Sequence, residues 1–369
     1  MISSQSRIAR WSSRVAQAAP LWVTLFLFAV AIIAYAGAVA GGLPGWAERL
    51  LDVVSTFTAV FLGIFIEAVP FLLLGTLASG MVEVFIERED LARWIPRQPL
   101  LAVLAGSLAG MFFPVCECGV VPFARRLMHK GVPVSVGIAT LLAAPVLNPI
   151  VIASTLAAFG PGPILWGRMG LSLVIATLTG FIFSMQPDQR ALLRGFGAQP
   201  SVGLPALVLA DTENSVLADT VNAVQADTAK PPLVVRLRQM LVVTADEFFE
   251  MGRFLILGAL LAALMQTVLR QSDLIAIGQG PVLSVLALVG LAVLLSICST
   301  VDAFIALAFA GTFTSGAILA FLVYGPMVDI KSILMFTQVF KPRVVIYLVL
   351  LPLLMTLILT ILTNYLWAG

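Results

Sequence analysis

The chain has 369 residues, of which 60% are apolar without counting glycine and 11% are charged, and its net charge is +2. A soluble domain carries about 25% charged residues, and the mean hydropathy of this chain is +1.06. These values exclude a soluble globular enzyme, a disordered protein and a nucleic-acid-binding protein. Three cysteines and one histidine also exclude a disulfide scaffold and a zinc-finger array. The composition predicts an all-α polytopic membrane protein.

Residues 1–54 contain a basic arm followed by a first apolar run at about 21–40. Arg7, Arg10 and Arg14 precede this run, which is long enough to span a bilayer and too long for the apolar part of a typical signal peptide. We therefore expect an uncleaved spanning helix, and the arginines place the N-terminus in the cytoplasm.

Further apolar runs of spanning length, and two shorter pairs of runs, follow along the chain. The long runs lie at about 55–86, 133–159, 164–185, 241–269, 316–340 and 343–364, and the short pairs at 100–115 with 117–124 and 281–297 with 299–312. If the clusters of Lys and Arg all face the cytoplasm, each short pair must enter and leave the membrane on one side. The sequence thus predicts seven spans and two re-entrant hairpins, with nine or more full spans as the alternative. Arg168 faces outward in this arrangement.

Residues 186–240 interrupt the apolar pattern with both acidic and basic residues, and Ala-Asp-Thr recurs at 210–212, 218–220 and 226–228. This repeat of eight fits neither a helical nor a strand stripe. We interpret the stretch as a cytoplasmic low-complexity linker, with a regulatory or partner-binding segment as the alternative. The predicted organisation is an arm with a first helix (1–54), a first transmembrane repeat (55–185), the linker (186–240) and a second transmembrane repeat (241–369).

The two repeats match at three anchors in the same order. Glu67 corresponds to Glu250 at an offset of 183, Cys116 to Cys298 at 182, and the segment 145–148 to 326–329 at 181. Each repeat has a spanning helix with a glutamate, a hairpin with a cysteine, a proline-broken helix and a final span. The parity of the spans makes the repeats inverted, which is the architecture of secondary transporters with a solute site near the membrane midplane.

Glu67 lies about a dozen residues into its predicted span, and Glu250 is its counterpart in the second repeat. Ionisable residues at membrane depth are costly and are candidates for function. We expect these two glutamates to couple transport to protons. The alternative is a structural hydrogen bond or an ion pair with a basic residue such as Arg253.

Polar residues gather at the two hairpin tips and at the helix breaks. Two thiols one residue apart can bind one soft ion or one thiophilic centre, and the third cysteine lies on the other tip; cysteine is also a common small buried hydrophobe. The candidate substrate-binding residues are Cys116, Glu117, Cys118, Cys298, Asn148, Asp302 and Asp329. The residues expected to break the helices are Pro114, Gly119, Pro122, Pro145, Pro149 and Pro326.

The segments 114–122, 131–133, 144–149, 298–304 and 325–331 resemble the predicted-permease family that includes the ArsP organoarsenical exporters and the YraQ-like proteins. The resemblance covers about 55–364 outside the linker. The family commonly has Cys-Ser-Cys-Gly at the first tip, whereas Glu117 replaces the serine here and adds a charge. The resemblance implies an efflux permease of the bacterial inner membrane, in a family linked to trivalent organoarsenicals or toxic metal ions.

We therefore expect a proton-coupled secondary efflux transporter of a thiophilic solute, such as a trivalent organoarsenical or a soft metal ion. One alternative is a transporter of another small solute with purely structural cysteines, and another is a membrane thiol-redox protein. No nucleotide, quinone, haem or flavin motif is visible, so we expect no enzyme activity and no cofactor, and we assign no metal site from the sequence. The expected partners are the lipid bilayer and a small molecule or ion, without nucleic acid, and a homo-oligomer is left open.

Overall fold

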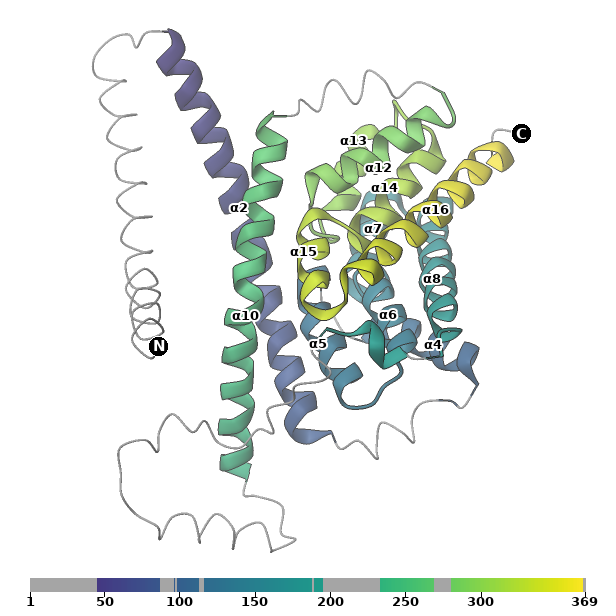
Figure 1. Cartoon of the computed structure of the whole chain (residues 1–369). Helices are drawn as coiled ribbons and strands as arrows, with labels where there is room; N and C mark the ends of the chain where they lie inside the picture. The colour runs from purple at the N-terminus through teal and green to yellow at the C-terminus, as the bar shows by residue number, and fades with distance from the viewer. Residues whose placement is uncertain are drawn as a thin grey trace, which may run out of the picture. The chain divides into compact units, whose positions relative to one another are not determined.

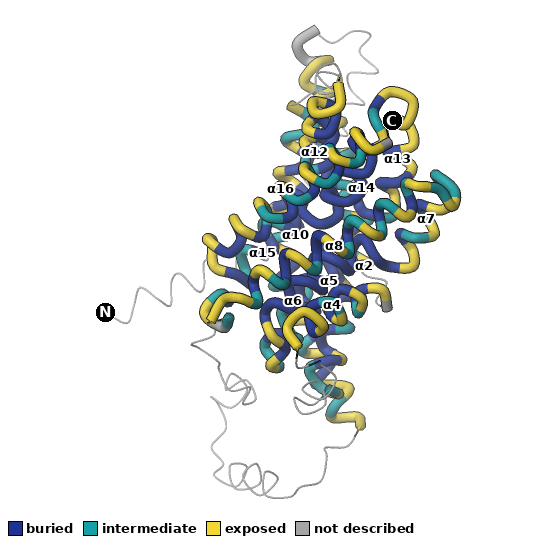
Figure 2. Tube along the Cα trace, turned by 90° about the vertical axis from the view of Figure 1, so that its right-hand side faces the viewer, coloured by how far each residue is buried: buried dark blue, intermediate teal, exposed yellow. Residues whose placement is uncertain are grey.

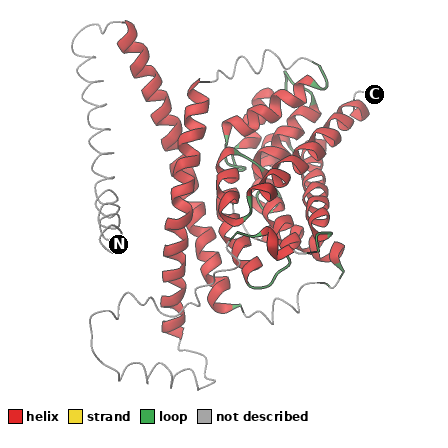
Figure 3. Cartoon of the chain, viewed as in Figure 1, coloured by secondary structure: helices red, strands yellow, loops and turns green. Residues whose placement is uncertain are grey.

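The computed structural model describes residues 45–86, 96, 98–112, 116–187, 189–194, 233–268 and 280–367. These ranges are helices joined by loops, and their only extended pairing is an isolated bridge between Leu193 and Phe340 (Figure 3). The predicted span at 21–40, Pro114 and residues 195–232 of the linker lie outside the described residues. The predicted all-α class is confirmed.

Each half of the chain contributes helices in a matching order (Figure 1). The helices of the first half are α2 (Gly45–Phe85), α4 (Pro99–Ala109), α5 (Glu117–His129), α6 (Val134–Ala143), α7 (Pro149–Phe159) and α8 (Pro163–Ser184), with short 3-10 helices at Gly110–Phe112 and Gln189–Leu192. The helices of the second half are α10 (Leu233–Val268), α12 (Leu283–Leu295), α13 (Asp302–Phe309), α14 (Ser315–Met327), α15 (Ile330–Val339) and α16 (Pro342–Trp367). Because α10 begins at Leu233, residues 233–240 are helical rather than part of the linker.

Five described segments are long and apolar enough to cross a membrane. They are Glu48–Phe85, Pro163–Ser184, Leu233–Val268, Ser315–Val339 and Pro342–Leu366. The predicted run at 133–159 is instead divided between the short helices α6 and α7, and α14 and α15 divide Ser315–Val339 in the same way. The chain is therefore a polytopic membrane protein in which some apolar segments are shorter than a span.

The two halves share most of their internal packing. In the first half α4 packs against α6, and α6 packs against α8; in the second half α12 packs against α14, and α14 packs against α16. The contacts between the halves also correspond to each other, because α5 of the first half packs against α15 of the second and α7 of the first half packs against α13 of the second. The first helices differ, since Gly75 of α2 lies against Gly119 of α5, whereas Gly258 of α10 lies against Lys331 of α15.

The two long helices α2 and α10 run in opposite directions where they meet (Figure 1). Arg236 donates a hydrogen bond to the carbonyl of Val84, and Thr244 donates one to the carbonyl of Thr76. The residue numbers therefore rise along α10 as they fall along α2. Opposite directions of the matching first helices are what inverted repeats require, and the inversion relative to a membrane stays a prediction.

Like α6, which is buried along its whole length, α14 is buried at every residue from Gly316 to Met327 (Figure 2). It packs against α12, α16, α8 and α13. Helices at the outside instead expose large apolar side chains, such as Trp166, Leu264 and Ile358. A helix that is apolar on all sides must be covered by other helices or by lipid, so these exposed side chains form a surface for the acyl chains.

The prolines that were expected to break helices lie at different positions relative to the helices. Pro145 lies in the turn after α6, and Pro149 is the first residue of α7, where a missing N–H costs nothing. Pro326 lies inside α14, one residue before its end.

The prediction that Gly119 and Pro122 break a helix is wrong. Helix α5 continues from Glu117 through both residues to His129. Pro122 lies inside α5 and lacks only the N–H that would donate to the carbonyl of Cys118, so the helix loses one hydrogen bond there. The glycine instead permits the close crossing with α2: a Cβ at Gly75 would lie 2.2 Å from the carbonyl oxygen of Gly119.

Candidate solute-binding site

The two cysteine-bearing tips meet inside the protein. Cys116 directly precedes α5, and Cys298 lies in the loop between α12 and α13. The two sulfur atoms and a carboxylate oxygen of Glu117 all lie within 4.8 Å of one another, and all three residues are buried. The side chain of Cys118, two residues along the chain from Cys116, is buried as well. Residues 182 positions apart in sequence thus form one cluster of soft ligands.

The position of Glu117 follows from local sequence and from the crossing of two helices. Cys116 has the extended backbone of an N-cap, and Glu117 is the first residue of α5. An acidic side chain is favoured at this end of a helix by the helix dipole. Because Gly75 and Gly119 bring the backbones of α2 and α5 together, the first turn of α5 is held deep inside the protein.

Lys331 of α15 is the basic partner of this cluster. Its Nζ atom lies 3.4 Å from Oε1 of Glu117 and 3.3 Å from Oδ2 of Asp329, and all three side chains are buried. Buried charges persist only when they are paired or bind a ligand. The second oxygen of Glu117, Oε2, is buried without a hydrogen bond, so one acceptor of the cluster is left for a ligand.

The structure gives two of the predicted binding residues a structural task at the helix breaks. Asn148 caps α7 by accepting a hydrogen bond from the N–H of Val151 at 2.9 Å. Asp329 caps α15 by accepting one from the N–H of Ser332, and the N–H of Asp329 in turn donates to the hydroxyl of Ser332, which completes a capping box. Both residues are buried. Of the two, Asp329 borders the thiol cluster, through its contact with Lys331.

Asp302 lies in a separate buried ion pair. Arg168 of α8 donates two hydrogen bonds to its carboxylate, at 3.1 Å and 2.7 Å, and a third to the hydroxyl of Thr155 in α7 at 2.8 Å. Arg168 is fully buried, and its predicted position toward the outer side of the membrane stays a prediction. A planar guanidinium can meet a carboxylate with two parallel bonds, and this pairing holds the arginine inside.

The two glutamates expected to carry protons lie in different environments. Glu67 of α2 is partly buried and is near enough to Cys298 for their charges to interact. The Glu250 side chain is 37% exposed and forms an ion pair with Arg125 at 3.0 Å. The buried acid of α10 is instead Glu247, one turn earlier, which accepts a hydrogen bond from Ser79.

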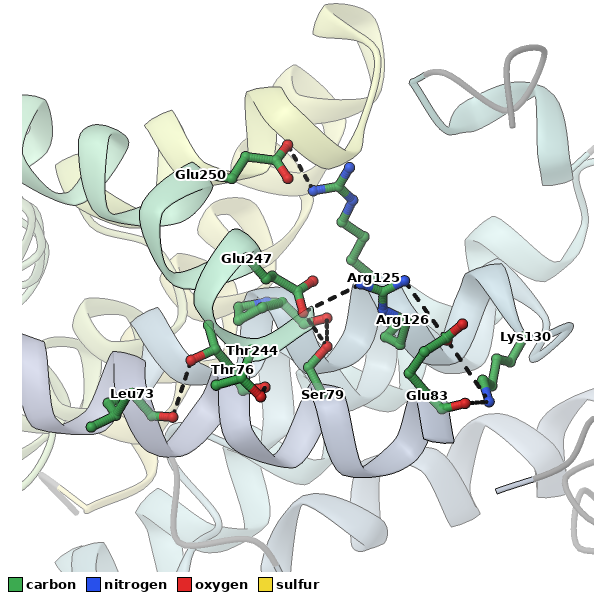
Figure 4. Close-up of polar contacts among 11 residues, drawn as sticks. Leu73, Thr76, Ser79, Glu83, Arg125, Arg126, Lys130, Thr244, Glu247 and Glu250 are labelled. Atoms are coloured by element: carbon green, nitrogen blue, oxygen red, sulfur yellow. Dashed lines mark hydrogen bonds and ion pairs between the residues drawn. The ribbon is translucent and has the colours of Figure 1, made fainter. Parts of the chain in front are cut away.

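A polar cluster joins α2, α5 and α10 beyond the thiols (Figure 4). Arg125 faces Glu250, whereas Arg126 lies 3.7 Å from Glu83 and 3.6 Å from Glu247. Lys130 at the end of α5 also lies 3.8 Å from Glu83. These ion pairs fix the end of α5 that is remote from Cys116.

His129 belongs to the same end of α5. Burial, assisted by the positive charges of Arg125 and Arg126, lowers the pKa of this histidine. The imidazole is therefore neutral at neutral pH, and the positive charge of this cluster resides on the arginines and Lys130.

Sequence reasoning pairs Lys331 with Asp329, as the structure does, but it misses Glu117 as a second partner of Lys331 and the pairs formed by Arg168 and Glu247. Lys331 is visible only as a neighbour of Asp329, Arg168 as one charge in an apolar run, and Glu247 as an acid one turn before Glu250. An isolated charge inside an apolar run is a signal of a buried pair. The identity of the partner requires the packing.

Comparisons with known proteins identify the family of the chain. Residues 53–365 match the family ArsP_1, described as a predicted permease. The chain is 43% identical over 292 residues to the UPF0718 protein YcgR of Bacillus subtilis, covering 79% of this chain and 91% of that protein. It is 34% identical over 291 residues to a Streptococcus mutans protein named as a putative two-component membrane permease complex subunit, covering 78% and 88%. No solved structure matches. With its helical membrane architecture and a match over most of its length, the chain belongs to the ArsP_1 family of predicted permeases.

Proposed function

We propose that this permease exports a thiophilic solute, such as a trivalent organoarsenical or a soft metal ion, across the bacterial inner membrane in exchange for protons. The observation that carries the proposal is the meeting of Cys116 and Cys298 with Glu117 within 4.8 Å, inside the protein and between its two halves. Thiolates are the protein ligands that soft ions prefer. The N-terminus is proposed to be cytoplasmic, as the arginines near it indicate.

A site shared by two repeats suits alternating access. In transporters with inverted repeats, one half rocks against the other around a site at their interface. Here one thiol comes from the first half and the other from the second. Rocking of the halves would therefore change the distance between the thiols, and with it the affinity for a bound solute.

Glu67 is the carboxylate that we propose for proton coupling. It is near enough to Cys298 for the charges to interact, whereas Glu250 and Asp302 each face an arginine. A carboxylate beside the solute site can exchange its proton as the solute arrives or leaves. Glu250 and Asp302 are thus proposed to stabilise the fold rather than to carry protons.

The test is a titration of the purified protein in detergent with phenylarsine oxide, using thermal stability as the readout. A ligand at about 100 times its Kd stabilises the folded protein by about 2.7 kcal/mol. We expect this stabilisation for the wild type and its loss in a Cys116→Ser/Cys298→Ser variant that has a normal elution profile.

Equal stabilisation of wild type and variant would contradict the proposal. Export of another solute, with cysteines that only pack, then becomes the better interpretation. In that case the serine variant exports normally, and the Glu67→Gln variant does not. A thiol-redox function is distinguished by turnover of a disulfide substrate that depends on the cysteines.

A further inference from the structure

We infer that the cargo of this site is a divalent metal cation of the soft or borderline class, bound by Cys116, Cys298 and Glu117. The inference rests on the proposed function and narrows its cargo, because a neutral organoarsenical needs only the thiols. Four observations carry it: the spacing of the three ligand atoms, the second oxygen of Glu117, the balance of charge, and the number of ligands.

The spacing suits a metal ion of the zinc and cadmium type. Bonds from zinc to thiolate sulfur are about 2.3 Å and bonds to carboxylate oxygen about 2.0–2.2 Å, so the ligand atoms of a tetrahedral site lie roughly 3.5–3.8 Å apart. The atoms of Cys116, Cys298 and Glu117 all lie within 4.8 Å of one another. Closure by about an ångström or less brings them to bonding geometry.

The two oxygens of Glu117 have different surroundings. Oε1 lies 3.4 Å from Nζ of Lys331. Oε2 is buried and accepts no hydrogen bond. A buried acceptor without a partner costs about 1–3 kcal/mol, and more when it is charged. A cation bound between the thiols would satisfy this oxygen, whereas a neutral arsenical brings no donor or positive charge to it.

The charge of the cluster also matches a divalent ion. Two thiolates and the Glu117 carboxylate carry three negative charges when a metal is bound. A divalent cation leaves one of them, which Lys331 neutralises from 3.4 Å. The remaining acid, Asp329, is stabilised by its position at the N-terminus of α15. A monovalent ion would leave one more negative charge in a buried site, which is unfavourable.

A metal site with three protein ligands suits a transporter, which must release the ion, better than it suits a permanent structural site. Structural zinc sites are closed by four protein ligands, whereas functional sites keep one position open for water or substrate. Cys118 is also buried, but its sulfur is not part of the group whose ligand atoms converge within 4.8 Å. An open fourth position allows an incoming ligand, such as water, to help release the ion.

The experiment measures binding of Cd²⁺ to the full chain in detergent, by the ultraviolet absorption of cadmium–thiolate bonds, in parallel with phenylarsine oxide. We expect Cd²⁺ to bind the wild type with this absorption. The Glu117→Gln variant should bind Cd²⁺ at least about tenfold more weakly, since even an outer-shell partner contributes that factor. Its affinity for phenylarsine oxide should be unchanged, which also shows that the variant is folded.

Glu83→Gln is the matched control, because it makes the same substitution in the polar cluster of Arg126 and Lys130, away from the thiols. It should bind Cd²⁺ like the wild type. A measurement that needs no variant is X-ray absorption of the cadmium complex of the wild type. Two sulfur ligands with at least one oxygen ligand support the inference, and three sulfur ligands without oxygen overturn it.

The remaining outcomes separate this inference from the proposed function. Equal Cd²⁺ affinity of wild type and Glu117→Gln, or binding of phenylarsine oxide but not of Cd²⁺, overturns the cation inference and leaves the thiophilic site standing. Binding of neither probe, or binding that persists in the Cys116→Ser/Cys298→Ser variant, overturns both.

Discussion

At the scale of single residues, the interior of this permease contains acids and bases that neutralise one another across the two halves. Glu117 of the first half faces Lys331 of the second, and Asp302 of the second half faces Arg168 of the first. Each pair contains the first residue of a short helix, α5 or α13. The pairs differ in their neighbours, because the first borders two thiols and the second borders the hydroxyl of Thr155. We propose that the first pair takes part in solute binding and that the second stabilises the fold.

The Arg168–Asp302 pair gives a prediction about stability. Replacing Arg168 by Met leaves the Asp302 carboxylate buried and unpaired, which should destabilise the protein by about 3–5 kcal/mol. The double variant Arg168→Met/Asp302→Leu removes both charges and should recover much of this loss. Thermal unfolding of the purified variants measures both effects. If the single variant unfolds at the wild-type temperature, the pair has no structural role.

At the scale of helices, the site depends on how closely α2 approaches α5. Gly75 and Gly119 place the two backbones in contact, and Ser79 and Glu83 continue the contact toward Pro122 and Arg126. The residue numbers rise together along both helices, so α2 and α5 run parallel here. Small residues at such crossings let membrane helices pack by close backbone contact. The position of Glu117 at the start of α5 is thereby fixed by a glycine of another helix.

A Gly75→Ala substitution tests this dependence. The new Cβ would lie 2.2 Å from a backbone oxygen of Gly119, and overpacking of this kind costs about 1–3 kcal/mol. We expect a lower unfolding temperature and weaker stabilisation by phenylarsine oxide, since α5 must move. Gly63→Ala on the same helix is the matched control, because a Cβ there meets nothing within 4 Å. Equal behaviour of the two variants would contradict the role of the crossing.

At the scale of the whole molecule, the two halves meet at the thiols and through the exchanged helix contacts of α5 with α15 and α7 with α13. Any motion of one half against the other must therefore change these contacts. The polar cluster of α2, α5 and α10 ties the far end of α5 to both long helices. The thiols are therefore a place where relative motion of the halves can be detected chemically.

Cross-linking of Cys116 to Cys298 provides that measurement. In a Cys118→Ser background, oxidation by copper–phenanthroline should join the two remaining thiols, whose sulfur atoms lie within 4.8 Å. Mass spectrometry of the peptides identifies the bond. We expect solute transport to stop on oxidation, because the halves can no longer separate, and to return on reduction. Undiminished transport by the cross-linked protein would show that the tips stay together throughout the cycle.

Much of the architecture could be predicted from the sequence because it depends on local composition. Apolar runs identify membrane helices, and the segment Asn148-Pro149 carries an N-cap residue and a proline at the start of α7. Local composition also produced the wrong prediction at Pro122. A proline by itself favours a helix break, but α5 continues past Pro122, where α2 packs against it.

The sequence by itself determined the membrane class, the family, the matching order of the two halves and the presence of thiols at both tips, since these follow from hydropathy and from motifs. Only the tertiary structure decided that Cys116 meets Cys298, that Lys331 faces Glu117 across 214 positions, and that Arg168 turns inward to Asp302 across 134. The physical reason is that a buried charge can be stabilised by any opposite charge that packing brings near it. Hydropathy shows that such a charge needs a partner, and the crossing of helices selects which one.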